Sequence, residues 1–443
     1  MNAAAGPFAV HAVAAELQRT LQRVPTVAER GRIVQAHGTT LRARGLSARI
    51  GQQCLVGTAG GRPLRAEVVG LANGEAILVP LGGLDELALD AEVEVIAEAP
   101  CVPCGEALLG RVVDAWGEPL DGRPLPPLPG VPLRAEAPDP LARRPVDEAF
   151  VTGVRAIDAL LTVGVGQRIG IFATAGGGKS TLLGMLARRA ACDVIVVALV
   201  GERGREVREF IDETLGPAGR ERSVVVVATS ERPAMERLRA AESATAIAEG
   251  FRAQGRRVLL LMDSVTRYAR ALREIGLAVG EPAVRRGFPP SVFAMLPRLF
   301  ERAGNDDRGS ITAFYAVLAE DDDGGDPIAE EVRSILDGHL VLARELGAAG
   351  HYPAIDVLAS ASRVFARVAT PAHRDAAARL RALLARHAEI RFLLQVGEYR
   401  AGSDALADLA IERRAAIDAL LRQRPDEASE FDATLARLRE VAA

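Results

Sequence analysis

The segment from residue 167 to residue 190 limits what this chain can fold into more than any other. Its letters predict a buried strand, QRIGIFA, then a glycine-rich turn, and then a helix, KSTLLGMLARRA. Glycines let backbone N–H groups approach phosphate oxygens, and the positive end of the following helix points at the same oxygens. This order predicts a phosphate-binding P-loop, ATAGGGKST, with Ala173 where the first glycine usually stands. A glycine-rich turn without a ligand is the alternative.

Lys179 lies in this loop and is the only lysine of the chain, which has 54 lysine and arginine residues in all. A compact ammonium can reach between the β- and γ-phosphates of a nucleotide, whereas a planar, forked guanidinium should not fit so narrow a cradle. This requirement explains one lysine in a chain that otherwise uses arginine. The neighbouring Ser180 hydroxyl is the expected ligand of Mg²⁺.

Strand and helix patterns divide the chain into three parts, since 443 residues are too many for one ordinary core. Short apolar runs from about Thr39 to Glu98 predict a small β-barrel. In the middle of the chain, buried β-branched runs alternate with helices, which indicates a parallel sheet covered on both faces. After about Pro371 only helices are predicted. The expected domains are an N-terminal helix plus β-barrel at 1–98, an α/β domain at 99–371 and a helical domain at 372–443.

Two segments lie outside this pattern. Residues 8–24, FAVHAVAAELQRTLQRV, place apolar side chains on one face of a helix. That helix either packs on its own domain or docks on a partner or a membrane surface. The proline-rich segment Pro119–Pro145 is expected to contain no regular helix or strand.

Composition argues against several classes of function. A net charge of −4 and 4% aromatic residues oppose a surface built mainly for nucleic acids. No secretory signal opens the sequence, and no apolar run approaches the about 18 residues that span a bilayer, so a reduced, cytoplasmic protein is expected. Cys101 and Cys104 form a lone CxxC pair, for which ordinary packing is a better interpretation than a metal or redox site.

Two acidic residues would complete a hydrolytic site. Asp263 ends the strand pattern VLLLMD and would hold the magnesium ion through water. Glu202 follows the strand pattern DVIVVALV at the same predicted sheet edge, where it could orient the attacking water. A salt bridge within its Arg/Glu cluster is the alternative for Glu202. For Arg363 and Tyr352 the residues alone indicate only positions in loops.

The central part of the chain resembles the catalytic subunits of hexameric, rotary-type ATPases, above all the ATPases of type III secretion systems and their flagellar export relatives. The strings that carry the likeness include ATAGGGKSTLLGMLAR, GERGREVREF, LLLMDSVTRYARALREIGLAVGEP and GHYPAIDVLASASRV. They lie between about Leu108 and Val364, and LLQVGEYRAGSD continues the likeness into the helical part. The first hundred residues match only loosely. The resemblance implies a RecA-like P-loop ATPase domain between the β-barrel and the helical domain.

The resemblance also implies roles for single residues. Glu202 would activate water, and Arg203 would lie beside the γ-phosphate. Arg363 would be the arginine finger that reaches into the neighbouring subunit's site, and Tyr352 would flank the adenine. Ser180 and Asp263 would serve the metal of Mg-ATP. The implied nucleotide-binding set is Ala173, Thr174, Ala175, Gly176, Gly177, Gly178, Lys179, Ser180, Thr181 and Tyr352.

By the same likeness, the chain would act as a ring-shaped homohexamer whose ATP hydrolysis drives chaperone release and the unfolding of export substrates. The implied partners are a central stalk, regulatory proteins of the export apparatus and chaperone–effector complexes, without nucleic acid. The implied location is the cytoplasm, with peripheral association at the bacterial inner membrane. The loop Gly280–Ser291, with Arg285 and Arg286 at its tip, would touch the stalk or a passing substrate; a solvated loop is the alternative.

Three strings, AEEVRSILDGH, AIDVLASASRV and GEY, favour the secretion ATPase over the flagellar export ATPase, which remains the main alternative. A rotary ATP synthase catalytic subunit is opposed by Ala173 and by the lack of a visible acidic loop motif in the C-terminal part. A ring-shaped nucleic-acid motor is opposed by the charge and by the lack of aromatic stacking strings. A regulatory nucleotide binder without hydrolysis is opposed by Glu202.

Overall fold

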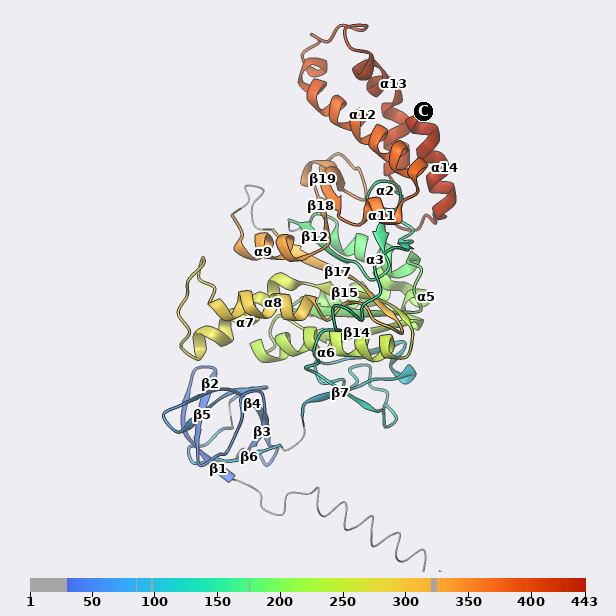
Figure 1. Cartoon of the computed structure of the whole chain (residues 1–443). Helices are drawn as coiled ribbons and strands as arrows, with labels where there is room; N and C mark the ends of the chain where they lie inside the picture. The colour runs from blue at the N-terminus through green and yellow to red at the C-terminus, as the bar shows by residue number, and fades with distance from the viewer. Residues whose placement is uncertain (1–29, 85, 97–98, 175, 320–324) are drawn as a thin grey trace, which may run out of the picture. The chain divides into compact units, whose positions relative to one another are not determined.

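The protein is described by a computed structural model that covers residues 30–84, 86–96, 99–174, 176–319 and 325–443 (Figure 1). The chain forms two compact units. The first comprises the described residues up to Pro100 together with Ala278–Gly280, and the second comprises Cys101–Leu277 and Glu281–Ala443. The helix expected at residues 8–24 lies outside the described residues.

The first unit is a closed β-barrel, as the alternating apolar runs predicted. Its strands follow the order β1-β2-β5-β4-β3-β6, and β6 closes the barrel by pairing with both β3 and β1. Alternate residues such as Leu41 and Ala43 point inward and are fully buried. Successive side chains of a strand point to opposite faces, so a sheet with one buried face buries every second residue. The strands are β1 (Arg30–His37), β2 (Thr40–Arg44), β3 (Gln53–Val56), β4 (Leu64–Ala72), β5 (Glu75–Pro80) and β6 (Glu92–Val95).

The second unit is built on a nine-stranded sheet. Its order is β19-β18-β12-β17-β15-β13-β14-β8, with β16 paired to β17. The pairs from β18 to β8 are all parallel, whereas β19 and β16 run antiparallel to their neighbours. The strands are β8 (Arg111–Val113), β12 (Arg168–Ala173), β13 (Val194–Val200), β14 (Ser223–Ala228), β15 (Arg257–Asp263), β16 (Gly304–Asn305), β17 (Ser310–Leu318), β18 (Gly338–Leu342) and β19 (Ile355–Ser362).

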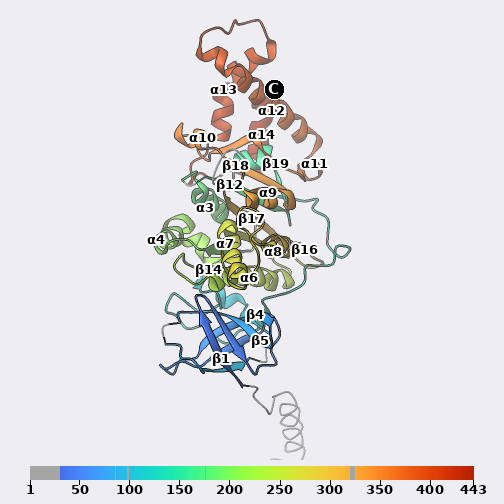
Figure 2. The same ribbon diagram turned by 90° about the vertical axis from the view of Figure 1, so that its left-hand side faces the viewer.

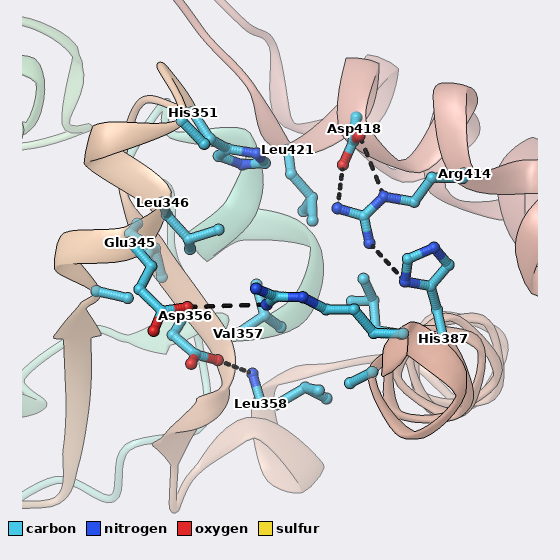
Figure 3. Close-up of a pocket in the computed structure, with 16 residues that line it drawn as sticks. Glu345, Leu346, His351, Asp356, Val357, Leu358, His387, Arg414, Asp418 and Leu421 are labelled. Atoms are coloured by element: carbon cyan, nitrogen blue, oxygen red, sulfur yellow. Dashed lines mark hydrogen bonds and ion pairs between the residues drawn. The ribbon is translucent and has the colours of Figure 1, made fainter. Parts of the chain in front are cut away.

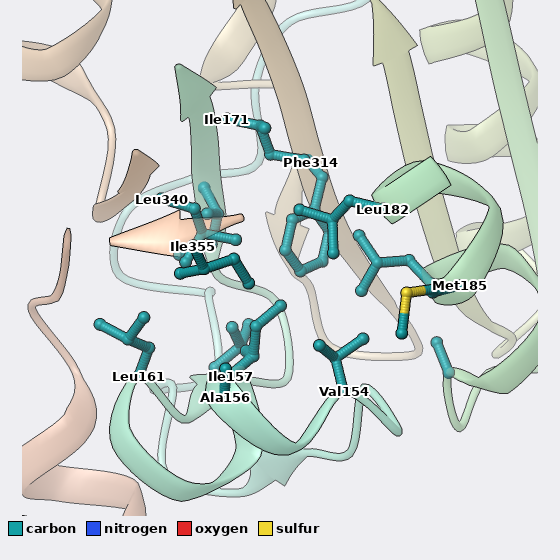
Figure 4. Close-up of a cluster of buried hydrophobic side chains, with 14 of the residues drawn as sticks. Val154, Ala156, Ile157, Leu161, Ile171, Leu182, Met185, Phe314, Leu340 and Ile355 are labelled. Atoms are coloured by element: carbon teal, nitrogen blue, oxygen red, sulfur yellow. The ribbon is translucent and has the colours of Figure 1, made fainter. Parts of the chain in front are cut away.

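Helices cover both faces of this sheet, as the near-continuous apolar strands predicted. On one face, Ile171 of β12 and Phe314 of β17 join a large apolar cluster with Leu182 of α3 and Ile157 of α2 (Figure 4). On the other face α6 packs across β13, β14 and β15, and Phe300 of α8 meets the next residue of β17, Tyr315, with 4.6 Å between the ring centroids. The helices are α2 (Arg155–Leu160), α3 (Lys179–Arg189), α4 (Gly204–Glu209), the π-helical turn η2 (Phe210–Leu215), α5 (Gly216–Glu221), α6 (Ala234–Ala253), α7 (Val265–Ala278), α8 (Pro290–Phe300), α9 (Pro327–Ile335), α10 (Arg344–Ala348) and α11 (Phe365–Val368).

The proline-rich segment departs from the expectation. Pro119–Pro145 contains a short strand, β9 (Gly130–Pro132), which pairs with β7 (Cys101–Pro103). Prolines are tolerated there because each strand pairs with only one partner, so its other edge needs no donor. Two further short elements are the 3₁₀ turn η1 (Glu106–Leu108) and the pair β10 (Ala149–Phe150) with β11 (Val163–Gly164). Cys104 is buried against α6, and its thiol meets the Ile247 carbonyl oxygen at 3.6 Å.

The C-terminal part of the second unit is helical, as predicted beyond Pro371. Figure 1 and Figure 2 show its helices extending beyond the β18–β19 edge of the sheet: α12 (Pro371–Gln395), α13 (Ala405–Leu421) and α14 (Phe431–Ala442). Their apolar faces, including Leu383, Ile417 and Leu438, belong to the same cluster as α2. Within the described ranges, every helix is too short or too polar to cross a bilayer.

Candidate functional site

The candidate site lies at the carboxyl ends of the parallel strands β12, β15 and β13. In register, Asp263 at the end of β15 stands opposite Leu199 of β13, and Glu202 follows two residues after β13 ends. The P-loop begins where β12 ends. Ligands of open α/β sheets bind at this edge because loops and helix N-termini converge there.

Glycines give the P-loop its path into α3. Gly176 and Gly178 have positive φ angles of 79° and 83°, a region that side-chain-bearing residues avoid. A Cβ at Gly177 would lie 3.1 Å from the Thr174 carbonyl oxygen, so the turn is also too tight for a side chain there. Ala173 is buried as the last residue of β12. Ala175 lies outside the described residues.

Lys179 brings the two predicted acidic residues together. Its Nζ forms an ion pair with Oδ1 of Asp263 and lies 3.5 Å from Oε1 of Glu202. Both carboxylates are buried, with 7% of Glu202 and 3% of Asp263 exposed. The structure therefore gathers three predicted residues from three strand ends into one charged cluster.

Burial and neighbouring charges set the protonation of these carboxylates. Burial raises the pKa of Asp263 to about 6, although the Lys179 charge opposes the rise. Burial would also raise the pKa of Glu202, but a hydrogen bond with Glu206 and the charges of Arg267 and Lys179 outweigh it and lower that pKa. The contact with Glu202 in turn raises the pKa of Glu206. Glu202 is therefore ionised well below neutral pH, whereas Asp263 takes up a proton at mildly acidic pH.

Arg267 is a member of the cluster that the sequence reasoning missed. Its guanidinium forms an ion pair with Oε1 of Glu202. Gly201 leaves room for it, because a Cβ there would lie 2.8 Å from Cδ of Arg267. Its position four residues after Asp263, in the first turn of α7, is the signal that could have found it, since that turn starts at the same sheet edge.

Oxygen donors around Lys179 fit a magnesium nucleotide. The Ser180 side chain is exposed in the first turn of α3, and Thr181 is half-buried beside it. The Thr174 hydroxyl oxygen is buried without a hydrogen-bond partner, so it remains free to bind a ligand. Among the described residues, no group of three or more acidic, His or Cys side chains is placed so that it could hold a metal ion by itself. A site with few hard oxygen ligands suits Mg²⁺, because this ion keeps several of its water ligands and takes others from the phosphates of the substrate.

Tyr352 lies beside the P-loop. It is 44% exposed, and its Cε1 is 3.6 Å from the point where a Cβ of Gly178 would stand. Its carbonyl oxygen accepts a hydrogen bond of 2.9 Å from the backbone N–H of Gln423 in the helical part. The two segments, distant in sequence, thereby place an exposed aromatic ring next to the phosphate-binding loop.

Arg203 and Arg363 lie apart from the Lys179 cluster. The Arg203 side chain is 74% exposed and 3.4 Å from Oε1 of Glu206. Arg363 follows β19 and is exposed, and its guanidinium donates to the Arg333 carbonyl oxygen at 3.5 Å. It lines a cavity of about 440 Å³ that also reaches Thr174.

A larger cavity of about 530 Å³ lies elsewhere in the second unit, between the β19 region and the helices α12 and α13 (Figure 3). Its charged side chains already have partners. Arg414 pairs with Asp418 at 2.9 Å and meets Nδ1 of His387 at 3.4 Å, and Asp356 accepts two backbone N–H groups. This cavity contains none of the P-loop residues, so its size does not make it the nucleotide site.

Comparisons with known proteins match almost the whole chain. Residues 153–362 match the ATP synthase alpha/beta family, nucleotide-binding domain, and residues 369–440 match the T3SS EscN ATPase C-terminal domain. A type 3 secretion system ATPase of Xanthomonas euvesicatoria is 55% identical over 427 residues, which cover 96% of this chain and 97% of that protein. A flagellum-specific ATP synthase of Bacillus subtilis is 48% identical over 411 residues, which cover 92% and 94%.

A solved structure has the same architecture. The assembled ATPase EscN from the enteropathogenic E. coli type III secretion system is 48% identical and superposes with a TM-score of 0.89 over 93% of this chain and 100% of that chain. EscN in complex with its central stalk EscO superposes with a TM-score of 0.86. The likeness therefore extends through barrel, sheet and C-terminal helices.

Proposed function

Because the chain belongs to the family of type III secretion ATPases, we propose that its ATPase activity energises protein export by releasing chaperones from export substrates and unfolding them. The observation that carries the chemistry is the convergence of Lys179, Glu202 and Asp263 at one sheet edge. Lys179 and the loop N–H groups would neutralise the γ-phosphate. Glu202 would orient the attacking water in line with the phosphorus.

A magnesium ion would be held by Ser180 directly and by Asp263 through water. When bound, Mg²⁺ neutralises charge on the β- and γ-phosphate oxygens. A cation beside Asp263 also favours its ionised form, which offsets the effect of burial on its pKa. Arg267 and Arg203 are proposed to contact the γ-phosphate, Arg203 after its side chain leaves Glu206. The exposed ring of Tyr352 would flank the adenine.

Arg363 is proposed to act in the neighbouring subunit of a homohexameric ring. Its exposure and its place outside the Lys179 cluster support a role in trans. An arginine finger contributes about 10³–10⁵ in rate by stabilising transition-state charge. Hydrolysis would therefore depend on assembly of the ring.

The proposed partners are a central stalk, regulatory proteins of the export apparatus and chaperone–effector complexes, with no nucleic acid. The proposed location is the cytoplasm, with the ring at the cytoplasmic face of the inner membrane. For the stalk, the loop Gly280–Ser291 is the proposed contact. Its Arg285 is 2.6 Å from Glu330 and lies over the Phe293 ring, so a stalk contact would have to compete with these partners.

Flagellar export is the second candidate function. The 48% identity to a flagellum-specific ATP synthase supports it, and the same residues would perform the same hydrolysis. Which genes surround this one would separate the two systems. Components of an injectisome beside it would favour secretion.

Replacing Glu202 by Gln tests the proposed reaction. Glutamine keeps the size of the side chain but cannot act as the charged group that orients water, so nucleotide binding is expected to persist while hydrolysis falls by on the order of 10²-fold or more. Fluorescent ATP analogues measure binding, and phosphate release measures turnover.

Glu209→Gln is the matched control, because Glu209 is half exposed and, among the described residues, forms its ion pair with Arg205 on the surface of α4. It should turn over ATP at the parental rate. Full turnover by Glu202→Gln would instead indicate that another group activates water.

A further inference from the structure

Arg333 stands in the last turn of α9, a helix whose first turn is capped and whose inner side is buried. The Asp326 side chain accepts hydrogen bonds from the N–H groups of Ile328 and Ala329, which caps the first turn. Ile328 and Val332 are buried beneath the helix. The capped and packed helix therefore places Arg333 reproducibly.

The side chain of Arg333 lies on the strand that leads into the P-loop. Its guanidinium carbon is 4.7 Å from the centroid of the Phe172 ring, a cation–π contact. The Phe172 ring cannot shift freely, because it lies over Gly170, where a Cβ would come within 2.5 Å, and it meets His339 edge-on at 6.1 Å. Phe172 is also the residue directly before Ala173.

The backbone of Arg333 meets Arg363. The Arg333 carbonyl oxygen accepts the 3.5 Å hydrogen bond from the Arg363 guanidinium, and both arginines line the cavity of about 440 Å³. After burial, the largest cause, the charges of Arg333 and Arg363 lower the pKa of His339, as expected if both cations lie near this ring. Phe172, Arg333 and Arg363 thus form a continuous chain of contacts from the P-loop strand to the proposed finger.

We propose that Arg333 is a positioning residue for Arg363, and that through Phe172 it couples the P-loop of one subunit to the arginine which that subunit presents to the next. The inference rests on the proposed role of Arg363. A movement of the end of β12 would displace the Phe172 ring, the guanidinium stacked on it, and the carbonyl that holds Arg363. The cavity that Arg333 and Arg363 line also reaches Thr174 of the P-loop, so a nucleotide bound to the loop can affect the position of both arginines.

A double-mutant cycle in the assembled protein tests this coupling. Arg333→Ala keeps the carbonyl oxygen but removes the stacked side chain, so kcat is expected to fall about tenfold while KM for ATP stays within about twofold. In an Arg363→Lys background the proposed finger is already impaired. There the same substitution should lower kcat by less than about twofold, because the effects of mutations within one network are not additive. Equal losses in both backgrounds, or no loss in either, would overturn the proposal.

Controls separate this inference from the proposed function. If Arg363→Lys keeps the parental kcat, the finger role itself is wrong; if it lowers kcat but Arg333→Ala does not, only the positioning role fails. Arg308→Ala, on an exposed arginine next to Asp307, should leave kcat unchanged. Should Arg333→Ala fail to fold, Phe172→Leu removes the same stacking from the other side and should reproduce both the kcat loss and its dependence on Arg363.

Discussion

Glu202 is buried and yet stays ionised, because positive charges and a hydrogen bond from Glu206 counteract the cost of burial. A base that orients water has to be charged at the pH of the reaction. Arg267 is one of the groups that keep it so, and it forms the ion pair with Oε1 of Glu202. If Glu202 has the role proposed above, the balance of charges around this carboxylate sets the pH range in which the site can work.

Replacing Arg267 by Ala should move the acidic limb of the pH profile. Loss of the Arg267 charge raises the pKa of Glu202, so kcat/KM should begin to fall at a higher pH than in the parent as the solution is acidified. Arg267→Lys keeps a positive charge and should keep the limb near its parental position. A limb that does not move in Arg267→Ala would show that Glu202 is not the group that titrates.

Among the residues discussed here, the sequence pattern identifies those that stand at the end of a strand and misses those that tertiary packing brings into place. Lys179, Glu202 and Asp263 were predictable because each stands just after or at the end of an apolar strand pattern, and parallel strands end at one edge. Arg333 was not, because its contact with Phe172 depends on how α9 packs beside β12. A chain with 54 lysines and arginines offers no sequence signal that separates such an arginine from the rest.

Among the elements, β8 shows how a short edge strand is held. Arg111 of β8 donates to both carboxylate oxygens of Asp121 at 2.7 Å, and both side chains are less than a tenth exposed. Hydrogen bonds with Arg111, the largest cause, lower the pKa of Asp121 well below its usual range. The pair ties the start of the proline-rich segment to the last strand of the sheet.

Asp121→Asn should weaken the second unit at neutral pH. Loss of the charge-assisted pair is expected to lower the free energy of unfolding by about 2 kcal/mol. Because the folded pKa is lowered, the parent's advantage exists above the ordinary aspartate pKa and shrinks as pH falls below about 4. Urea midpoints at pH 7 and pH 3 measure this difference.

The exposed pair of Arg424 and Asp426 offers the control for that comparison. Asp426→Asn should leave both midpoints unchanged, since exposed ion pairs contribute little. A difference between parent and Asp121→Asn that stays constant from pH 7 to pH 3 would contradict the assignment of the effect to this carboxylate.

Elements with a strong period were predictable, and short ones were not. The strands β12, β13, β14 and β15 and the long helix α12 stand where continuous apolar runs or a helical period placed them. The three-residue strands β7 and β9 have no periodic signal, and proline density argued against β9. They form because two distant segments pair, which a local pattern cannot reveal.

For the whole molecule, the finger that we propose is supplied in trans would make hydrolysis a property of the assembly. The turnover per subunit should rise with protein concentration and level off once rings are complete, whereas Arg363→Ala should stay low at every concentration. Steady-state phosphate release, with the mass of the assembly followed by light scattering, measures both. A rate per subunit that does not depend on concentration while the mass changes would remove Arg363 from its assigned role.

The three-part plan of the chain followed from changes in periodicity along the sequence, and the fold class was predictable for that reason. The α/β part and the C-terminal helices are distinct in the sequence pattern, but in the structure they share buried contacts. Gln423 is buried, its side-chain oxygen accepts from the Arg155 N–H at 2.8 Å, and its amide donates to the Gly153 carbonyl. A side chain from the last fifth of the chain thereby completes the N-terminal end of α2.

The apolar cluster shared by α2 and the C-terminal helices has a consequence for how this protein can diversify. Helices α12, α13 and α14 cannot be replaced as an independent module. Without them, Ile157 and Leu160 of α2 would be exposed to solvent, and these residues belong to the same apolar cluster as the P-loop helix α3. The outward side of those helices is therefore freer to change in sequence, whereas their inward side has to change together with α2 and the rest of the apolar cluster.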